Sequence, residues 1–177
     1  MGRLDGKKVV IVIAPRGFRD EEYQQPRTIL EKEGAAITVA STSLEPATGM
    51  LGAEVKPDAL LKDIAAADYD AVVFVGGTGA REYWNNPVAQ SLAKAGSLGG
   101  KIVGAICIAP VILANANLLT ARKATVFESE KMKLRSKGAI LSTKHVEQDG
   151  NLITGDGPSA AGEFGRALLE ALAVKKA

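Results

Sequence analysis

The feature that most constrains the fold of this chain is a series of short, uninterrupted apolar runs. Residues 7–14 (KKVVIVIA) form the first, and similar runs occupy residues 36–41 (AITVAS), 69–75 (YDAVVFV) and 101–106 (KIVGAI). A strand that is exposed on one face alternates apolar and polar residues, whereas a continuous β-branched run is typical of a parallel strand covered on both faces. The runs therefore predict a parallel sheet inside the protein.

Segments with helical patterns separate these runs. Helices are expected over residues 21–33, 58–67, 87–95, 108–118, 130–137 and 162–174. A fifth strand is expected over residues 123–127, an irregular excursion or hairpin over residues 49–56, and a hairpin of residues 144–148 and 151–154 around Asp149 and Gly150. The alternation predicts an α/β fold: a flavodoxin-like open parallel sheet with helices on both faces, or α/β/α sandwich. At this length we expect a single domain, residues 1–177.

Composition and charge argue against several classes of protein. The 22 Lys and Arg residues nearly balance the 20 Asp and Glu residues, and no basic block is present, so nucleic-acid binding is not expected. No apolar run is long enough to cross a membrane, and the N-terminal residues lack a signal-peptide core, so we expect a cytoplasmic protein. One cysteine and one histidine predict neither an internal disulfide nor a structural metal site.

That single cysteine, Cys107, stands where an apolar strand pattern ends and a helical pattern begins, within residues 101–110 (KIVGAICIAP). Such a sharp turn is a nucleophile elbow: it exposes the side chain above the sheet, next to backbone N–H groups that can bind an oxyanion. The start of a helix also lowers the pKa of a thiol. The alternative is that Cys107 is simply a small buried apolar residue.

The predicted topology brings three strand ends to one edge of the sheet. The loop after residue 14 leads to Glu21 and Glu22, the third run ends at Gly76 and Gly77, and the fourth ends at Cys107. Ligands of open α/β sheets bind outside the carboxyl ends of the strands. The glycine turn matches neither the dinucleotide-binding pattern nor the Walker pattern, so a nucleotide cofactor is not expected.

Four short motifs, in this order and spacing, resemble the ThiJ/PfpI family. They are residues 18–22 (FRDEE), 75–77 (VGG), 105–110 (AICIAP) and 149–154 (DGNLIT). This superfamily contains the Parkinson-associated protein deglycase, the PfpI intracellular proteases and bacterial stress chaperones, within the class I glutamine amidotransferase-like fold. The resemblance extends from about residue 7 to residue 173.

The resemblance implies a reactive Cys107 hydrogen-bonded to a protonated Glu22, with the backbone N–H groups of Gly77 and Ile108 as the oxyanion hole. Gly76, Phe127 and Asp156 are further candidates for the pocket. Glu21 competes with Glu22, because side chains about 100° apart on a helix cannot both face the cysteine. The alternative for both glutamates is a solvated pair that complements the helix dipole.

The chain also departs from the family pattern. Protease-type members carry a histidine directly after the cysteine, where this chain has Ile108, and the deglycase branch carries one at the position aligned with Phe127. The only histidine, His145, falls in the hairpin region, where a surface or interface role is the expected one. Asp156 stands where the deglycase branch has an arginine; it either adds negative charge at the pocket mouth or caps or approaches the final helix.

These observations support three hypotheses. The first is a stress-protective enzyme of the glyoxalase III or deglycase type, which acts on reactive 2-oxoaldehydes or their protein adducts without a cofactor or metal. The second is a redox-sensing or chaperone-like stress protein whose lone cysteine oxidises. The third, a PfpI-type peptidase, is the weakest mechanistically because no histidine follows the cysteine. The resemblance also implies a homodimer, or a higher oligomer, whose contact surfaces the sequence does not locate.

Overall fold

The computed structural model describes residues 2–174, and its centre is a seven-stranded sheet. The strand order is β11-β12-β8-β7-β1-β3-β6, and every pair is parallel except β11 with β12. The strands are β1 (Lys8–Val12), β3 (Ala36–Ser41), β6 (Ala59–Leu60), β7 (Ala71–Phe74), β8 (Ile102–Ile106), β11 (Val146–Asp149) and β12 (Leu152–Gly155). The expected open parallel sheet is confirmed.

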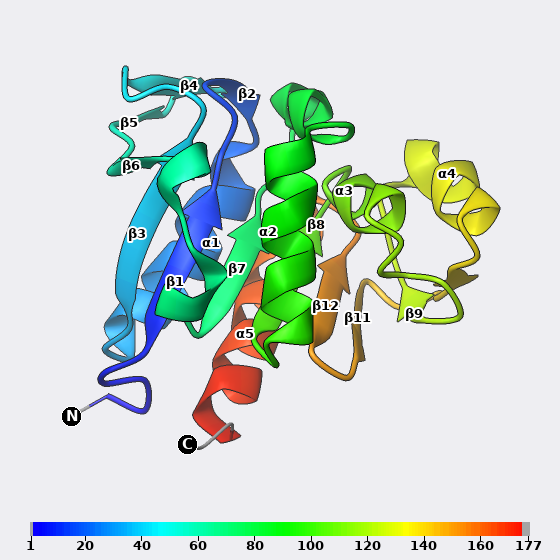
Figure 1. Cartoon of the computed structure of the whole chain (residues 1–177). Helices are drawn as coiled ribbons and strands as arrows, with labels where there is room; N and C mark the ends of the chain where they lie inside the picture. Colours follow the sequence, from blue (N-terminus) through cyan, green and yellow to red (C-terminus); the bar gives the residue numbers. More distant parts are fainter. Residues whose placement is uncertain (1, 175–177) are drawn as a thin grey trace.

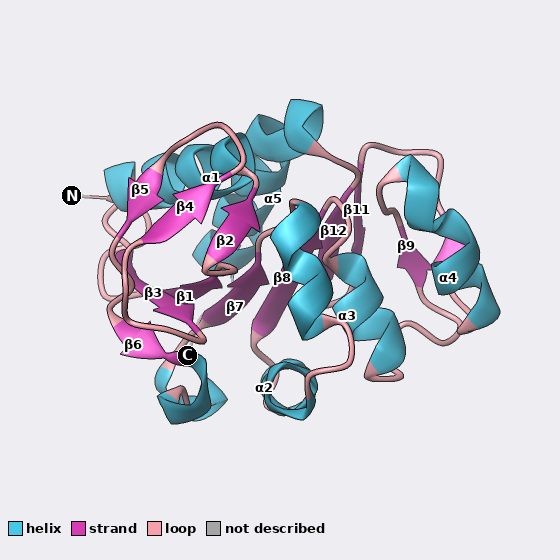
Figure 2. Cartoon of the chain, turned by 90° about the horizontal axis from the view of Figure 1, so that it is seen from above, coloured by secondary structure: helices cyan, strands magenta, loops and turns pink. Residues whose placement is uncertain are grey.

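The sheet is buried on both faces, as its uninterrupted apolar runs predict. In the first run, Val9 and Ile11 belong to one apolar cluster, whereas Val10 and Val12 belong to the other. Helices α1 (Asp20–Lys32) and α5 (Ala161–Val174) cover the first face, and α2 (Pro87–Leu98) and α3 (Pro110–Asn115) cover the second. Figures 1 and 2 show these three layers, with the sheet between the two pairs of helices.

A small three-stranded sheet lies outside the main sheet. Strands β2 (Arg16–Phe18), β4 (Ala47–Gly49) and β5 (Glu54–Val55) form a three-stranded sheet, in which β4 and β5 are antiparallel. The excursion expected near residues 49–56 is therefore a hairpin. The buried carboxylate of Asp20 fixes it, because Asp20 accepts hydrogen bonds from the backbone N–H groups of Leu51 (2.9 Å) and Ala53 (2.8 Å).

Two expected elements are wrong in detail. Residues 58–67 form the short edge strand β6 followed by 3-10 turns at Leu61–Asp63 and Ala66–Asp68 instead of an α-helix. Of the fifth strand over residues 123–127, only β9 (Lys123–Ala124) exists, and it pairs with β10 (Ile140–Leu141) outside the main sheet. Strand β12 pairs with β8 instead, and the turn at Asp149 and Gly150 connects β12 to β11.

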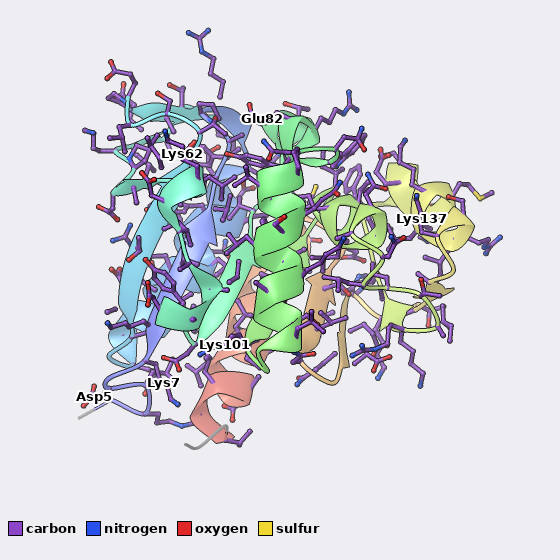
Figure 3. All side chains as sticks on the ribbon, viewed as in Figure 1. Asp5, Lys7, Lys62, Glu82, Lys101 and Lys137 are labelled. Atoms are coloured by element: carbon purple, nitrogen blue, oxygen red, sulfur yellow. The ribbon has the colours of Figure 1, made fainter. Side chains whose placement is uncertain are left out.

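The remaining helix, α4 (Lys131–Ser136), lies near β9 and β10 at one side of the molecule (Figure 1). Figure 3 shows charged side chains around the outside of the molecule, among them Lys62, Glu82 and Lys137, whereas Asp20 and Glu22 are buried. Within residues 2–174, no helix combines the length and apolar character that crossing a membrane requires. The expected single domain, residues 1–177, includes positions 1 and 175–177, which lie outside the described residues.

Candidate active site

Cys107 occupies a strained turn directly after β8. Its backbone has φ of 66°, a left-handed conformation that is uncommon for a residue with a side chain and costs about 1–3 kcal/mol. Two hydrogen bonds hold this turn: the Cys107 N–H donates to the Gly155 carbonyl (2.9 Å), and the Cys107 carbonyl accepts from the Phe127 N–H (2.8 Å). The second bond also explains why residues 125–127 leave the strand geometry, since they cross over the elbow. Strain held in place by neighbouring segments is common at functional positions.

Glu22, in the first turn of α1, is the acid that faces the cysteine. Its side chain is fully buried and interacts with Cys107, and its Oε1 accepts a hydrogen bond of 3.0 Å from the Gly76 N–H. Glu21 instead points outward and forms an ion pair with Arg19 at 2.8 Å. The arrangement separates the two candidates, because only Glu22 lies beside Cys107, with Gly76 between their side chains.

The turn after β7 allows this contact because it contains glycine. A Cβ atom at Gly76 would lie 2.5 Å from the Cβ of Cys107 and 2.6 Å from Oε1 of Glu22. Both distances are far below van der Waals contact, so any side chain would push the two groups apart. Glycine at this position therefore permits the close approach of acid and thiol.

Backbone donors complete the surroundings of the sulfur. The backbone N–H groups of Gly77 and Ile108 favour the ionised form of the Cys107 thiol and so act to lower its pKa. The backbone of Ile108 is also held at the next peptide, because the Trp84 indole N–H donates to the Ile108 carbonyl at 3.0 Å. Tyr83 is buried and donates its hydroxyl hydrogen to the Ile13 carbonyl. These two aromatic residues thus pack the glycine loop onto the sheet.

Burial sets the titration of the acid and the thiol. It raises the pKa of Glu22 from 4.5 to about 8. It also raises the pKa of Cys107 to about 12, with the negative charge of an ionised Glu22 as the second cause and the Gly77 and Ile108 N–H groups acting in the opposite direction. The expectation that a helix start lowers the thiol pKa is wrong for this resting state, because desolvation outweighs the backbone donors.

The proton on Glu22 therefore decides how easily the thiolate forms. Once Glu22 is protonated, its charge no longer opposes ionisation of Cys107, whereas both backbone donors remain. Among the described residues, Oε2 of Glu22 is buried without a hydrogen-bond partner of standard geometry, although the carboxyl interacts with Cys107. A protonated carboxyl would carry its hydrogen there. The pair is best described as one unit that exchanges a proton.

Cys107 opens into a cavity of about 140 Å³. Its lining residues are Arg19, Met50, Gly77, Thr78, Arg81, Cys107, Ile108, Phe127, Ser129 and Pro158. Phe127 lines this cavity, whereas Gly76, the other residue expected there, is not among the lining residues and lies beside the Cys107 Cβ. The sequence did not predict four of these lining residues, namely Arg19, Met50, Arg81 and Ser129. For the two arginines, the only sequence feature that could have indicated a place in the pocket is that each follows the end of a strand.

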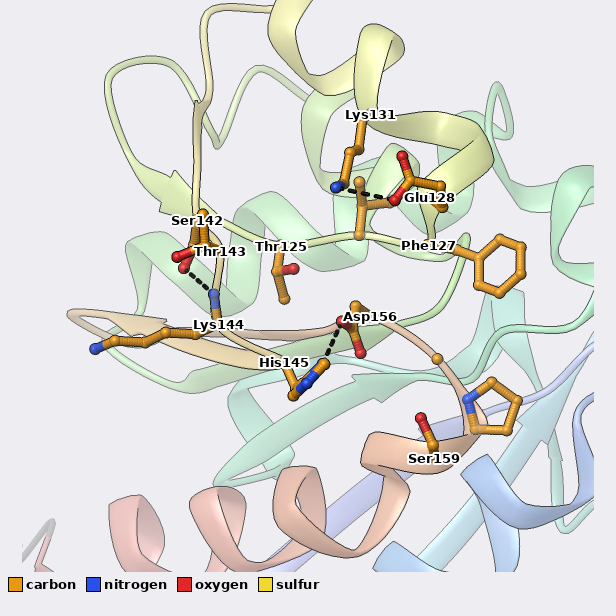
Figure 4. Close-up of a pocket in the computed structure, with 13 residues that line it drawn as sticks. Thr125, Phe127, Glu128, Lys131, Ser142, Thr143, Lys144, His145, Asp156 and Ser159 are labelled. Atoms are coloured by element: carbon orange, nitrogen blue, oxygen red, sulfur yellow. Dashed lines mark hydrogen bonds and ion pairs between the residues drawn. The ribbon is translucent and has the colours of Figure 1, made fainter.

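Asp156 and His145 belong to a second, neighbouring cavity of about 210 Å³ (Figure 4). Their side chains pair at 2.8 Å, and the hydrogen bond to Asp156 raises the pKa of His145. Phe127 and Pro158 line both cavities. Asp156 thus lies in the adjoining cavity and is absent from the residues that line the Cys107 pocket. It approaches the final helical segment without capping it, because Gly157 occupies the N-cap position and no side chain caps that segment. His145 is largely exposed and is absent from the residues that line the Cys107 pocket.

Comparison with known proteins finds one family and several relatives that match nearly the whole chain. The model of the DJ-1/PfpI family matches residues 7–171. Glutathione-independent glyoxalase DJR-1.2 of Caenorhabditis elegans is 29% identical over 166 residues, covering 94% of this chain and 89% of that protein. Deglycase PH1704 of Pyrococcus horikoshii is 30% identical over 150 residues, covering 85% and 90%. The crystal structure of a ThiJ/PfpI domain protein from Brachyspira murdochii has a TM-score of 0.94 and 33% identity, covering 97% of this chain and 100% of that chain.

Proposed function

This chain belongs to the DJ-1/PfpI family, and on that premise we propose that it is a stress-protective, cysteine-dependent enzyme that acts on reactive 2-oxoaldehydes or their protein adducts. The observation that carries the proposal is the contact between Cys107 and the buried Glu22 beside two backbone donors. The relatives named as a glyoxalase and a deglycase support the same chemistry.

The reaction begins when the Glu22 carboxylate takes the proton of the Cys107 thiol, which gives a thiolate beside a protonated acid. The Cys107 thiolate attacks the aldehyde carbon of the 2-oxoaldehyde, so that a carbon–sulfur bond forms and the carbonyl electron pair moves to oxygen. The N–H groups of Gly77 and Ile108 stabilise this oxyanion. The protonated carboxyl of Glu22 then delivers its proton to the oxyanion, which gives a hemithioacetal and a Glu22 carboxylate.

The carboxylate of Glu22 next acts as a base. It removes the hydrogen from the carbon bonded to sulfur and returns a proton to the adjacent carbonyl carbon, while the hydroxyl proton passes from the first oxygen to the second; together these transfers convert the hemithioacetal into a thioester. Water hydrolyses the thioester, releases a 2-hydroxy acid and restores the thiol. The sum is addition of one water to the 2-oxoaldehyde, with one carbon oxidised and its neighbour reduced, so the step needs no external oxidant or reductant.

Lactate formation from methylglyoxal tests this proposal. We expect turnover by the wild-type protein and its loss in both Cys107→Ser and Glu22→Gln. Wild-type turnover no faster than that of the two variants would reject the proposal.

A second candidate function is a redox sensor or chaperone-like stress protein. The observation in its favour is that the donors around the Cys107 sulfur can also bind the oxygens of a sulfinic acid. Peptide mass spectrometry after graded peroxide separates the two functions. Ready formation of sulfinic acid at Cys107 without carbonyl turnover would favour the sensor.

A PfpI-type peptidase has less support, because Ile108 and Phe127 occupy the two positions at which relatives carry histidines, and no imidazole lines the described Cys107 pocket. Lack of cleavage of casein at several pH values would remove it. The homodimer and the cytoplasmic location remain predictions, which light scattering and cell fractionation would check.

A further inference from the structure

The charges that line the Cys107 pocket are all of one sign. Of its ten lining residues, Arg19 and Arg81 carry guanidinium groups, and none carries a carboxylate. The acid of the site, Glu22, lies buried beside the cysteine, and its pKa of about 8 keeps it mainly protonated at neutral pH. A substrate that enters the pocket at neutral pH therefore meets positive charge at its walls.

Arg19 contributes little to this charge, because Glu21 neutralises it. The Arg19 Nε and Nη2 atoms donate to the two oxygens of Glu21 at 2.8 and 3.0 Å, the fork geometry of a bidentate pair. Those donors are already occupied by a carboxylate. Arg81 has no such bidentate partner among residues 2–174.

Arg81 lies in the 3-10 turn Thr78–Tyr83, which follows Gly77. Its guanidinium stands over the Trp84 ring, 5.7 Å from the ring centroid, and no ion pair to it is found within residues 2–174. The nearby acids make their direct contacts elsewhere: Glu130 pairs with Lys133 at 2.8 Å, and Glu82 accepts a hydrogen bond from the Thr42 hydroxyl. The Glu130 carboxylate acts on Arg81 only through its charge, and it does not line the pocket. Stacking on the indole orients the guanidinium but leaves its N–H donors available.

We propose that Arg81 is a specificity-determining residue that selects 2-oxoaldehydes bearing a carboxylate over neutral ones. This rests on the proposed function for the carbonyl chemistry, and adds the class of substrate. A cavity of about 140 Å³ has room for roughly four to five water volumes, which suits a short carbon chain with the aldehyde at Cys107 and the carboxylate at Arg81. Asp156 does not oppose an anion here, because it lies in the adjoining cavity and is paired with His145.

The decisive test compares two alkylating reagents that differ mainly in charge, iodoacetate and iodoacetamide. The rate of modification of Cys107 by each is followed by mass spectrometry of the intact protein, and their ratio is compared with the same ratio for glutathione. We expect a higher ratio for the wild-type protein than for glutathione, and a ratio about two- to fivefold lower in Arg81→Gln, as is typical of one exposed charge interaction. Added salt should weaken the preference.

Matched variants make the result specific to Arg81. Arg81→Lys keeps the charge and should retain most of the preference, whereas Arg135→Gln removes an exposed arginine of α4 and should leave the ratio unchanged. Circular dichroism checks that each variant is folded. A ratio in Arg81→Gln equal to that of the wild-type protein would overturn the proposal, as would an equal fall in Arg135→Gln.

Turnover provides a second readout. The ratio of kcat/KM for 4,5-dioxopentanoate, a 2-oxoaldehyde with a carboxylate, to that for methylglyoxal should fall in Arg81→Gln, and an unchanged ratio would overturn the proposal. If neither compound is turned over by the wild-type protein, the proposed function fails, whereas the alkylation ratio still decides the role of Arg81.

Discussion

Replacing Glu22 by glutamine should remove a pH dependence of stability that only a buried acid can produce. Burial raises the pKa of Glu22 from 4.5 to about 8, so the folded protein holds this proton more tightly than the unfolded chain does. The stabilising effect of the proton is complete below pH 4.5 and is lost as the pH rises through about 8. Cys107 does not disturb this range, because its thiol stays protonated in both states until more alkaline pH.

The magnitude follows from linkage. A rise in pKa from 4.5 to about 8, at about 1.4 kcal/mol per pH unit, corresponds to a loss of stability of about 5 kcal/mol between these limits. Glutamine has nearly the same shape and stays neutral. The unfolding free energy of Glu22→Gln minus that of the wild-type protein should therefore rise by roughly 4 kcal/mol between pH 4.5 and pH 7.5.

Urea unfolding at a fixed protein concentration, repeated from pH 4.5 to pH 8, measures this difference. Glu21→Gln is the matched control: it removes the neighbouring carboxylate, whose pKa the Arg19 guanidinium lowers, and should leave the steep wild-type dependence in place. Parallel pH profiles for Glu22→Gln and the wild-type protein would refute the idea that Glu22 is a buried, protonated acid.

Three further predictions concern the groups around this acid. Gly76→Ala should lose at least tenfold in turnover and about 1–3 kcal/mol in stability, because the new methyl group would lie 2.5 Å from the Cβ of Cys107; activity and thermal unfolding check both, and wild-type behaviour would contradict the packing argument. Trp84→Phe leaves the Ile108 carbonyl without its indole donor, so a folded variant with several-fold lower kcat/KM is expected, and unchanged kinetics would show that this support is dispensable. His145→Ala should change lactate formation by less than twofold, because the histidine pairs with Asp156 in the neighbouring cavity; a large loss would instead give it a catalytic role.

Most of the fold was predictable because a strand that is buried on both faces has a continuous run of apolar residues in the sequence. The apolar runs of β1, β3, β7 and β8 gave four central strands, and Asp149 with Gly150 gave the hairpin. The errors arose where tertiary contacts override local pattern. Residues 125–127 have the β-branched composition of a strand, but Thr125 and Phe127 donate their N–H groups to the Thr154 hydroxyl and the Cys107 carbonyl.

The candidate site was predictable only in its outline. Strand ends placed Cys107, Gly77 and Glu22 together, but the choice of Glu22 over Glu21 depended on family resemblance, since a helical step of 100° does not say which side chain faces inward. The raised thiol pKa was missed because desolvation depends on how many atoms surround the sulfur. Arg81 was missed for a similar reason: its place in the pocket depends on the path of the turn after Gly77.

The handedness of the product tests the central claim most directly. In this account Glu22 delivers the proton to the second carbon from one side, while Cys107 holds the substrate by its first carbon, so chiral chromatography should show one enantiomer of lactate in large excess. The uncatalysed reaction of methylglyoxal has no such preference. Racemic lactate from the wild-type protein would contradict the claim that Cys107 and Glu22 together carry the reaction.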